Sequence, residues 1–203
     1  MPRALFAAGR NTGYISAGSW APPFFTALSW VMPEFVARSI IGWLGWGGMI
    51  AIAWMLSRVL PWTAVPGADP SVDPTREPLT IAVRTAAILT VSWLITSPYT
   101  LSWYDLTAWV PLALLASTRL DALLMWRGAW LSVAYVTGRA VQFSDGMKAT
   151  AWVVRDVLCS GAQILVIVMV VLWWWRDGHE LPSLSVWRHR WHAARHATAP
   201  ATD

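Results

Sequence analysis

The chain has 203 residues, of which 56% are hydrophobic, 13% are charged and 17 are tryptophan. A soluble domain of this size carries about a quarter charged residues, so this composition indicates either a very large buried core or lipid as the solvent. The layout of the long apolar runs decides for lipid. The formal net charge is +4, but the arginines are spread along the loops and the C-terminal tail, which argues against a nucleic-acid-binding face. The single cysteine, Cys159, supports neither an intrachain disulfide nor a thiolate metal cluster.

Residues 1–35 are expected to form an outer-face loop with a short interfacial segment that is rich in tryptophan and phenylalanine. The Pro22-Pro23 pair and Pro33 exclude one long helix here. The first predicted span covers residues 36–57, where Gly42, Gly45, Gly47 and Gly48 cluster. Small residues on one helix stripe favour close packing of a neighbouring helix, and a substrate groove is the alternative interpretation.

A polar, proline-rich loop is predicted after the first span, and the second span follows at residues 79–97. Pro78 suits the opening position of that helix. Arg84 lies about one and a half turns inside it, within snorkelling distance of the interface. The sequence SPYTLSWYD at residues 97–105 then breaks the helical pattern with polar and aromatic residues.

Three further helices are predicted, at residues 104–118, 120–137 and 150–175. The last contains no charge between Val157 and Trp175, and a helix of that length nearly matches the hydrocarbon thickness of about 30 Å. A backbone in lipid must satisfy its own hydrogen bonds, so these runs are predicted to be helical.

The predicted fold is therefore all-α, a polytopic integral membrane helical bundle of about five transmembrane or membrane-embedded helices. Residues 36–175 would form the transmembrane domain, and residues 176–203 a basic, flexible cytoplasmic tail. Counting arginine and lysine near the span ends gives seven inside against six outside for this orientation in the cytoplasmic membrane. The breaks at residues 13–35, 97–105 and 138–156 would then share the outer face.

All four histidines lie in the tail, and His189, His192 and His196 could share one face of a helix. A basic segment that faces solvent or lipid headgroups is the commoner explanation of such a pattern, and a metal site is the alternative. The sequence contains no nucleotide-binding loop, zinc motif or nucleophile elbow. We therefore expect no metal and no cofactor, and no catalytic residue is assigned.

The break at residues 97–105 is the candidate site. Tyr99, Trp103, Tyr104 and Asp105 combine hydroxyls, aromatic planes and a carboxylate at the membrane boundary, as sugar-binding sites do. We expect these four to line an outer cavity, with Arg139 or Arg155 close enough to bind a phosphate. The alternative is that Asp105 only caps its helix, that the aromatic residues form an interfacial belt, and that Arg155 pairs with Asp156 or solvent.

The order REPLTIAVRTAAILTVSWLITSPYTLSWYDLTAWVPLALLA, residues 76–116, resembles the C-terminal half of bacterial polyprenol-phosphomannose-dependent alpha-1,6-mannosyltransferases of the GT-C superfamily. In that family an acidic-Pro pair opens a span, and a short outer loop ends in Pro-Trp-Tyr before a Trp-bearing apolar helix. Glu77-Pro78 and Ser102-Trp103-Tyr104 stand at the matching places, with Ser102 where the family often has proline. Residues 13–30 are also similar to an outer-face loop of the family.

The resemblance implies a membrane glycosyltransferase that moves mannose from a polyprenyl-phosphate donor to a cell-envelope glycan, such as lipomannan, on the outer face of the cytoplasmic membrane. Family members have roughly twice as many helices, and their catalytic carboxylate lies in a first outer loop that has no counterpart here. We therefore expect this chain to need a separate N-terminal half, and to transfer no mannose alone. The alternatives are a non-catalytic membrane scaffold or subunit and, with less support, a small transporter. The transporter has less support because only Arg84 and Arg127 lie well inside predicted spans, and neither has an acidic partner at that depth in the same span.

Overall fold

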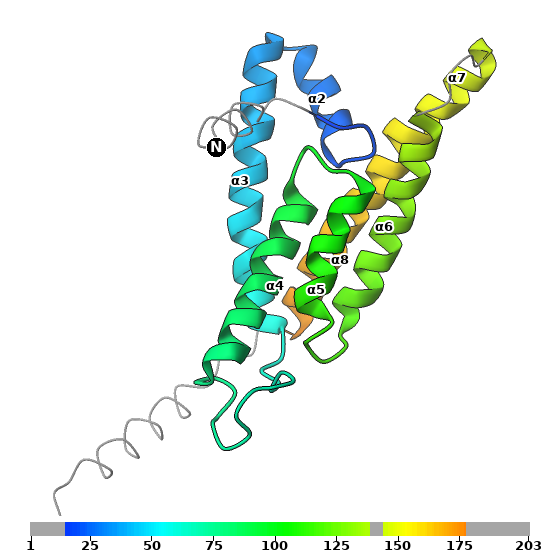
Figure 1. The fold of residues 1–203 in the computed structure, drawn as a ribbon. Helices are drawn as coiled ribbons and strands as arrows, with labels where there is room; N and C mark the ends of the chain where they lie inside the picture. Colours follow the sequence, from blue (N-terminus) through cyan, green and yellow to red (C-terminus); the bar gives the residue numbers. More distant parts are fainter. Residues whose placement is uncertain (1–14, 139–143, 178–203) are drawn as a thin grey trace, which may run out of the picture.

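The computed structural model describes residues 15–138 and 144–177, and every regular element within them is helical (Figure 1). The all-α prediction is therefore confirmed for the described part of the chain. In chain order the elements are α2 (Ala21–Ser29), α3 (Glu34–Val59), α4 (Pro78–Thr96), the 3₁₀ helix η1 (Ser102–Asp105), α5 (Leu106–Leu112), α6 (Arg119–Gly138), α7 (Asp145–Trp152), the π-helix η2 (Val153–Cys159) and α8 (Ser160–Asp177).

Three helical stretches in the described residues are long and apolar enough to cross a membrane: Glu34–Val59, Pro78–Thr96 and Gly146–Asp177. The predicted number of about five spans is not confirmed. The helix predicted at residues 104–118 is much shorter in the structure, where α5 has 7 residues. Pro111 lies near its end and lacks the backbone N–H that a longer helix would use. The 20-residue helix α6 is long enough, but it carries charged residues at Arg119, Asp121 and Arg127.

Helix α4 begins where the sequence indicates, with Pro78 in its first turn and the Glu77 carboxylate accepting a hydrogen bond from the Thr80 backbone N–H. That hydrogen bond lowers the pKa of Glu77 below its usual value. The helix ends at Thr96, before the Ser97-Pro98 pair.

Arg84 reaches the end of α3, and its depth relative to a membrane interface stays a prediction. Its side chain is buried, and it donates hydrogen bonds to the carbonyl oxygens of Ser57 (2.8 Å) and Leu60 (3.0 Å) at the end of α3. The guanidinium also lies 3.9 Å from the ring centroid of Trp62. The last carbonyls of a helix have no partner within the helix, so Arg84 acts as a C-terminal cap for α3.

The glycines of α3 explain how closely α3 approaches the end of α4. A Cβ on Gly45 would lie 3.1 Å from Cδ of Pro98 and 3.2 Å from the carbonyl oxygen of Thr96, and one on Gly48 would lie 3.3 Å from Cγ2 of Thr96. A Cβ on Gly47 would meet nothing within 4 Å. The packing interpretation of the cluster is thus confirmed at Gly45 and Gly48.

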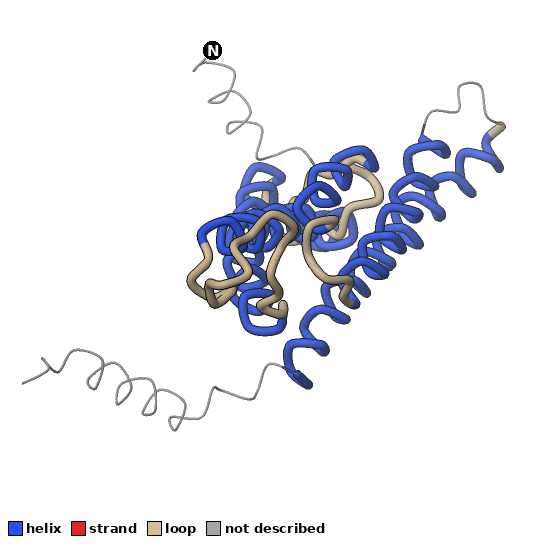
Figure 2. Tube along the Cα trace, turned by 60° about the horizontal axis from the view of Figure 1, so that its bottom comes forward, coloured by secondary structure: helices blue, strands red, loops and turns tan. Residues whose placement is uncertain are grey.

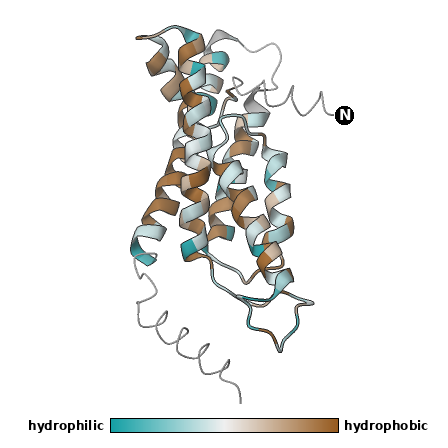
Figure 3. Ribbon diagram, turned by 90° about the vertical axis from the view of Figure 1, so that its left-hand side faces the viewer, coloured by the Kyte–Doolittle hydropathy of each residue, from teal (hydrophilic) through white to brown (hydrophobic). Residues whose placement is uncertain are grey.

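The main core lies between α3, α4, α5, α6 and α8, and its buried residues include Leu56, Val91, Leu94, Leu124 and Val166. The stretch from α7 through η2 to α8 runs alongside α6, as Figure 2 shows. Hydrophobic residues are frequent along the helices, and the loop at residues 60–77 is mainly hydrophilic (Figure 3). Large apolar side chains such as Trp43 and Ile50 point outward, as lipid-facing residues would.

The described parts of the three breaks lie at one end of the bundle. Residues 15–33, residues 97–105 and the start of η2 gather at the upper end in Figure 1, while the loop at residues 60–77 and the end of α8 lie at the other. This agrees with the predicted common face. Which side of a membrane that face occupies stays a prediction.

Candidate functional site

Residues 15–20 and residues 96–100 are joined by hydrogen bonds at the upper end of the bundle. The Ser16 hydroxyl donates to the Thr100 carbonyl oxygen and accepts from the Thr100 N–H, both at 2.9 Å. The Ser16 N–H donates to the Pro98 carbonyl oxygen at 3.0 Å, and the Trp20 indole N–H donates to that of Thr96 at 2.8 Å. The chain cannot continue α4 beyond Ser97-Pro98, so backbone groups exposed there find partners in the N-terminal segment.

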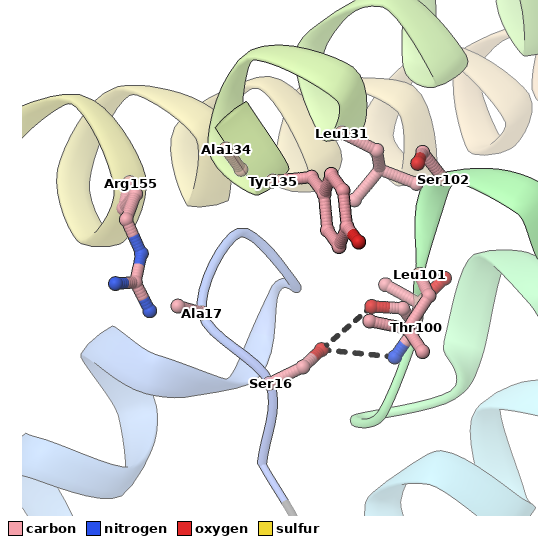
Figure 4. Close-up of a pocket in the computed structure, with 9 residues that line it drawn as sticks. All are labelled: Ser16, Ala17, Thr100, Leu101, Ser102, Leu131, Ala134, Tyr135 and Arg155. Atoms are coloured by element: carbon pink, nitrogen blue, oxygen red, sulfur yellow. Dashed lines mark hydrogen bonds between the residues drawn. The ribbon is translucent and has the colours of Figure 1, made fainter. Parts of the chain in front are cut away.

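A pocket of about 210 Å³ opens beside this junction (Figure 4). It is bounded by loop residues and by side chains from α6 and η2, and its lining consists of Ser16, Ala17, Thr100, Leu101, Ser102, Leu131, Ala134, Tyr135 and Arg155. Tyr135 and Arg155 both reach from their helices toward the loop segments. The lining therefore combines hydroxyl groups and one guanidinium with apolar surface.

Arg155 is the one predicted site residue that lines this pocket. It lies in η2, whose π-helical winding often marks functional positions in helices. The side-chain Nε atom is buried and has no hydrogen-bond partner among the described residues. A buried donor without a partner costs free energy, and the guanidinium to which it belongs supplies the positive charge of the pocket lining. Arg139, the alternative cation, lies outside the described residues.

Asp105 is buried and forms an ion pair with Arg127 of α6, which is also buried. The Arg127 guanidinium donates further hydrogen bonds to the Leu94 carbonyl oxygen (2.7 Å) and to the Thr100 hydroxyl (2.8 Å). Asp105 directly precedes α5, but its side chain makes no capping hydrogen bond. Its role is thus neither the simple cap nor the open pocket group that the sequence suggests.

The second carboxylate oxygen of Asp105, Oδ2, is buried without a hydrogen-bond partner in the described part of the chain. A Cβ on Gly128 would lie 3.3 Å from this atom. The absence of a side chain at Gly128 therefore lets the carboxylate approach α6. Sequence reasoning missed this pair because it sought a partner for Arg127 only inside membrane spans, whereas Asp105 comes from the break.

Tyr99, Trp103 and Tyr104 form an aromatic cluster next to the pocket rather than in its lining. Tyr99 and Trp103 are exposed, and Tyr104 is half-buried against Trp93 with ring centroids 5.9 Å apart. Trp103 also packs edge-to-face on Tyr135, at 5.1 Å between centroids. The cluster is therefore connected to the pocket through the Tyr135 ring.

The pocket lining can bind an anion and hydroxyl groups, but it contains no carboxylate. Within the described residues no three His, Cys, Asp or Glu side chains gather as metal ligands would. The tail histidines and the tail itself, apart from Arg176 and Asp177, lie outside the described residues.

No family model, no curated protein and no solved structure matches this chain.

Proposed function

We propose that this chain is the donor-binding part of a membrane glycosyltransferase that moves mannose from a polyprenyl phosphate to a cell-envelope glycan on the outer face of the cytoplasmic membrane. The observation that carries the proposal is the Arg155 side chain in a hydroxyl-lined pocket at the end of an apolar bundle. The likeness of residues 76–116 to the mannosyltransferases supplies the identity of the sugar.

The pocket has the chemical groups that a lipid-linked sugar phosphate requires. A guanidinium makes charge-assisted hydrogen bonds to phosphate, so Arg155 would hold the phosphate of the donor. The Ser102 hydroxyl would bind a sugar hydroxyl, and the exposed Trp103 ring beside the pocket would cover a sugar face. The polyprenyl chain would lie along the apolar exterior of the helices.

Transfer also requires a base that takes the proton of the acceptor hydroxyl. The nearby Asp105 is held by Arg127 and buried, and it does not line the pocket. The pocket as arranged would therefore bind the donor, and a carboxylate from outside its lining would supply the base.

Donor binding tests this proposal directly. The purified chain in lipid nanodiscs should bind synthetic polyprenyl phosphomannose, and Arg155→Gln should weaken the affinity at least about tenfold, because it removes charge-assisted hydrogen bonds. Lys148→Gln is the matched control, since Lys148 is an exposed cation on α7 that does not line the pocket. No binding by the unaltered chain, or equal weakening by both variants, would contradict the proposal.

A non-catalytic scaffold is the second candidate, and the Asp105–Arg127 pair favours it. This pair fastens the break to α6, which is what an architectural role requires. Complementation of a deletion strain separates the two functions. A scaffold tolerates Arg155→Gln and fails with Arg127→Gln, whereas a donor-binding protein fails with both.

A further inference from the structure

A second concave surface lies at the opposite end of the bundle, between α6 and α8. It is a groove of about 540 Å³ whose interior is apolar, with Leu172, Trp126 and Trp173 among its lining residues. Arg119, at the start of α6, and Arg176, in the last turn of α8, complete the lining. The groove thus combines apolar walls with two guanidinium groups at one end.

The two guanidiniums share a single carboxylate. Arg119 Nη1 lies 3.4 Å from Oδ2 of Asp177, and Arg176 Nε donates to Oδ1 of Asp177 at 3.0 Å. Asp121, the acid in the first turn of α6, accepts a hydrogen bond from the Thr118 backbone N–H at 2.6 Å and so caps that helix. Both arginine side chains are more than half exposed, so most of their donors face outward.

We propose that this groove binds an anionic phospholipid, with its phosphate between Arg119 and Arg176 and an acyl chain along the apolar walls. Charge complementarity selects this occupant, because within residues 15–138 and 144–177 the two cations at the groove have one shared anion. Basic pockets between membrane helices bind anionic headgroups in this way. A zwitterionic lipid would bring its own cation toward the guanidiniums. The site is independent of the pocket at the other end and of the activity proposed for it.

Lipid binding is measured on the purified full chain by native mass spectrometry, with dioleoyl phosphatidylglycerol competing against dioleoyl phosphatidylcholine. The unaltered chain is expected to retain phosphatidylglycerol preferentially. Arg119→Gln combined with Arg176→Gln should lower the preference by about tenfold or more, since each cation contributes separately. Arg58→Gln is the control, because Arg58 is an exposed cation in the last turn of α3 and does not line the groove.

Two further variants keep the test independent of folding defects. Asp177→Asn retains both arginines and removes the competing anion, so it should preserve or strengthen the preference. Ala122→Phe retains all the charges but fills part of the groove, and it should lower retention of both lipids. Equal retention of the two lipids by the unaltered chain, or a preference unchanged by the double arginine substitution, would overturn the proposal.

Discussion

Asp105 and Arg127 illustrate how a buried charge is stabilised in an apolar bundle. Each would be costly alone, since removing an ionised group from water is compensated only by a partner and further hydrogen bonds. Arg127 meets this requirement with three acceptors: Asp105, the Leu94 carbonyl oxygen and the Thr100 hydroxyl. Thr100 in turn binds Ser16, so the pair is connected to the junction that forms the pocket.

Breaking this pair should destabilise the protein strongly. Arg127→Gln leaves Asp105 buried and unpaired, and we expect a loss of about 3–5 kcal/mol in unfolding free energy. Asp105→Asn should cost less unfolding free energy in the Arg127→Gln background than in the unaltered protein, because the two residues interact. Reversible denaturation in detergent measures both.

The exposed pair between Glu34 and Arg38, at 3.7 Å, is the matched control for this experiment. Its side chains are 72% and 44% exposed, so Arg38→Gln should change the unfolding free energy by less than about 1 kcal/mol. Similar small effects at Arg127 and Arg38 would show that the buried pair contributes little.

Helices whose positions depend on neighbouring residues in the sequence, such as apolar runs and prolines at their ends, could be predicted. The apolar runs, Pro78 and the Ser97-Pro98 pair indicate α3, α4 and the break after α4 correctly. The shortness of α5 could not be predicted, because its apolar run continues beyond Pro111. The π-helical winding of η2 also lacks a sequence signal, yet it lies where Arg155 meets the pocket.

Long-range contacts explain the differences at the candidate site. The sequence indicates correctly that Arg155 and the break lie at the same end of the bundle. It does not reveal that Ser16 binds Thr100, because the two lie 84 positions apart and neither belongs to a periodic pattern. For the same reason the direction of Asp105, toward Arg127 rather than into a cavity, depends on how α6 packs.

The contact between α3 and α4 gives a prediction at the scale of the elements. Gly45→Leu should destabilise the protein by about 1–3 kcal/mol, because its side chain would meet Pro98 and the Thr96 carbonyl group. Gly47→Leu is the control at a neighbouring position with open space, and it should be neutral or stabilising, since leucine favours a helix more than glycine does. Thermal unfolding of the two variants in the same detergent compares them. Equal shifts in Tm would contradict the proposed close packing.

For the whole molecule, the testable property is which end of the bundle faces the cell exterior. In Figure 1 the chain runs down α3, up α4, down α5, up α6 and down α8. The loop containing Ser71 and the helix containing Gly146 therefore lie at opposite ends. We predict that α7 faces outward and the loop at residues 60–77 faces the cytoplasm. Single cysteines placed at these two exposed positions report this orientation.

In intact cells, a membrane-impermeant thiol reagent should label Gly146→Cys and leave Ser71→Cys unlabelled until the membrane is permeabilised. The native Cys159 is fully buried, so the parental chain should give little background in either condition. Neither substitution disturbs packing, because a Cβ on Gly146 meets nothing within 4 Å and Ser71 lies in an exposed turn. The reverse pattern would place the tail outside and the candidate pocket in the cytoplasm, where a donor presented on the outer face could not reach Arg155. Labelling of both positions in intact cells would instead mean that these two ends of the bundle are not on opposite sides of the membrane.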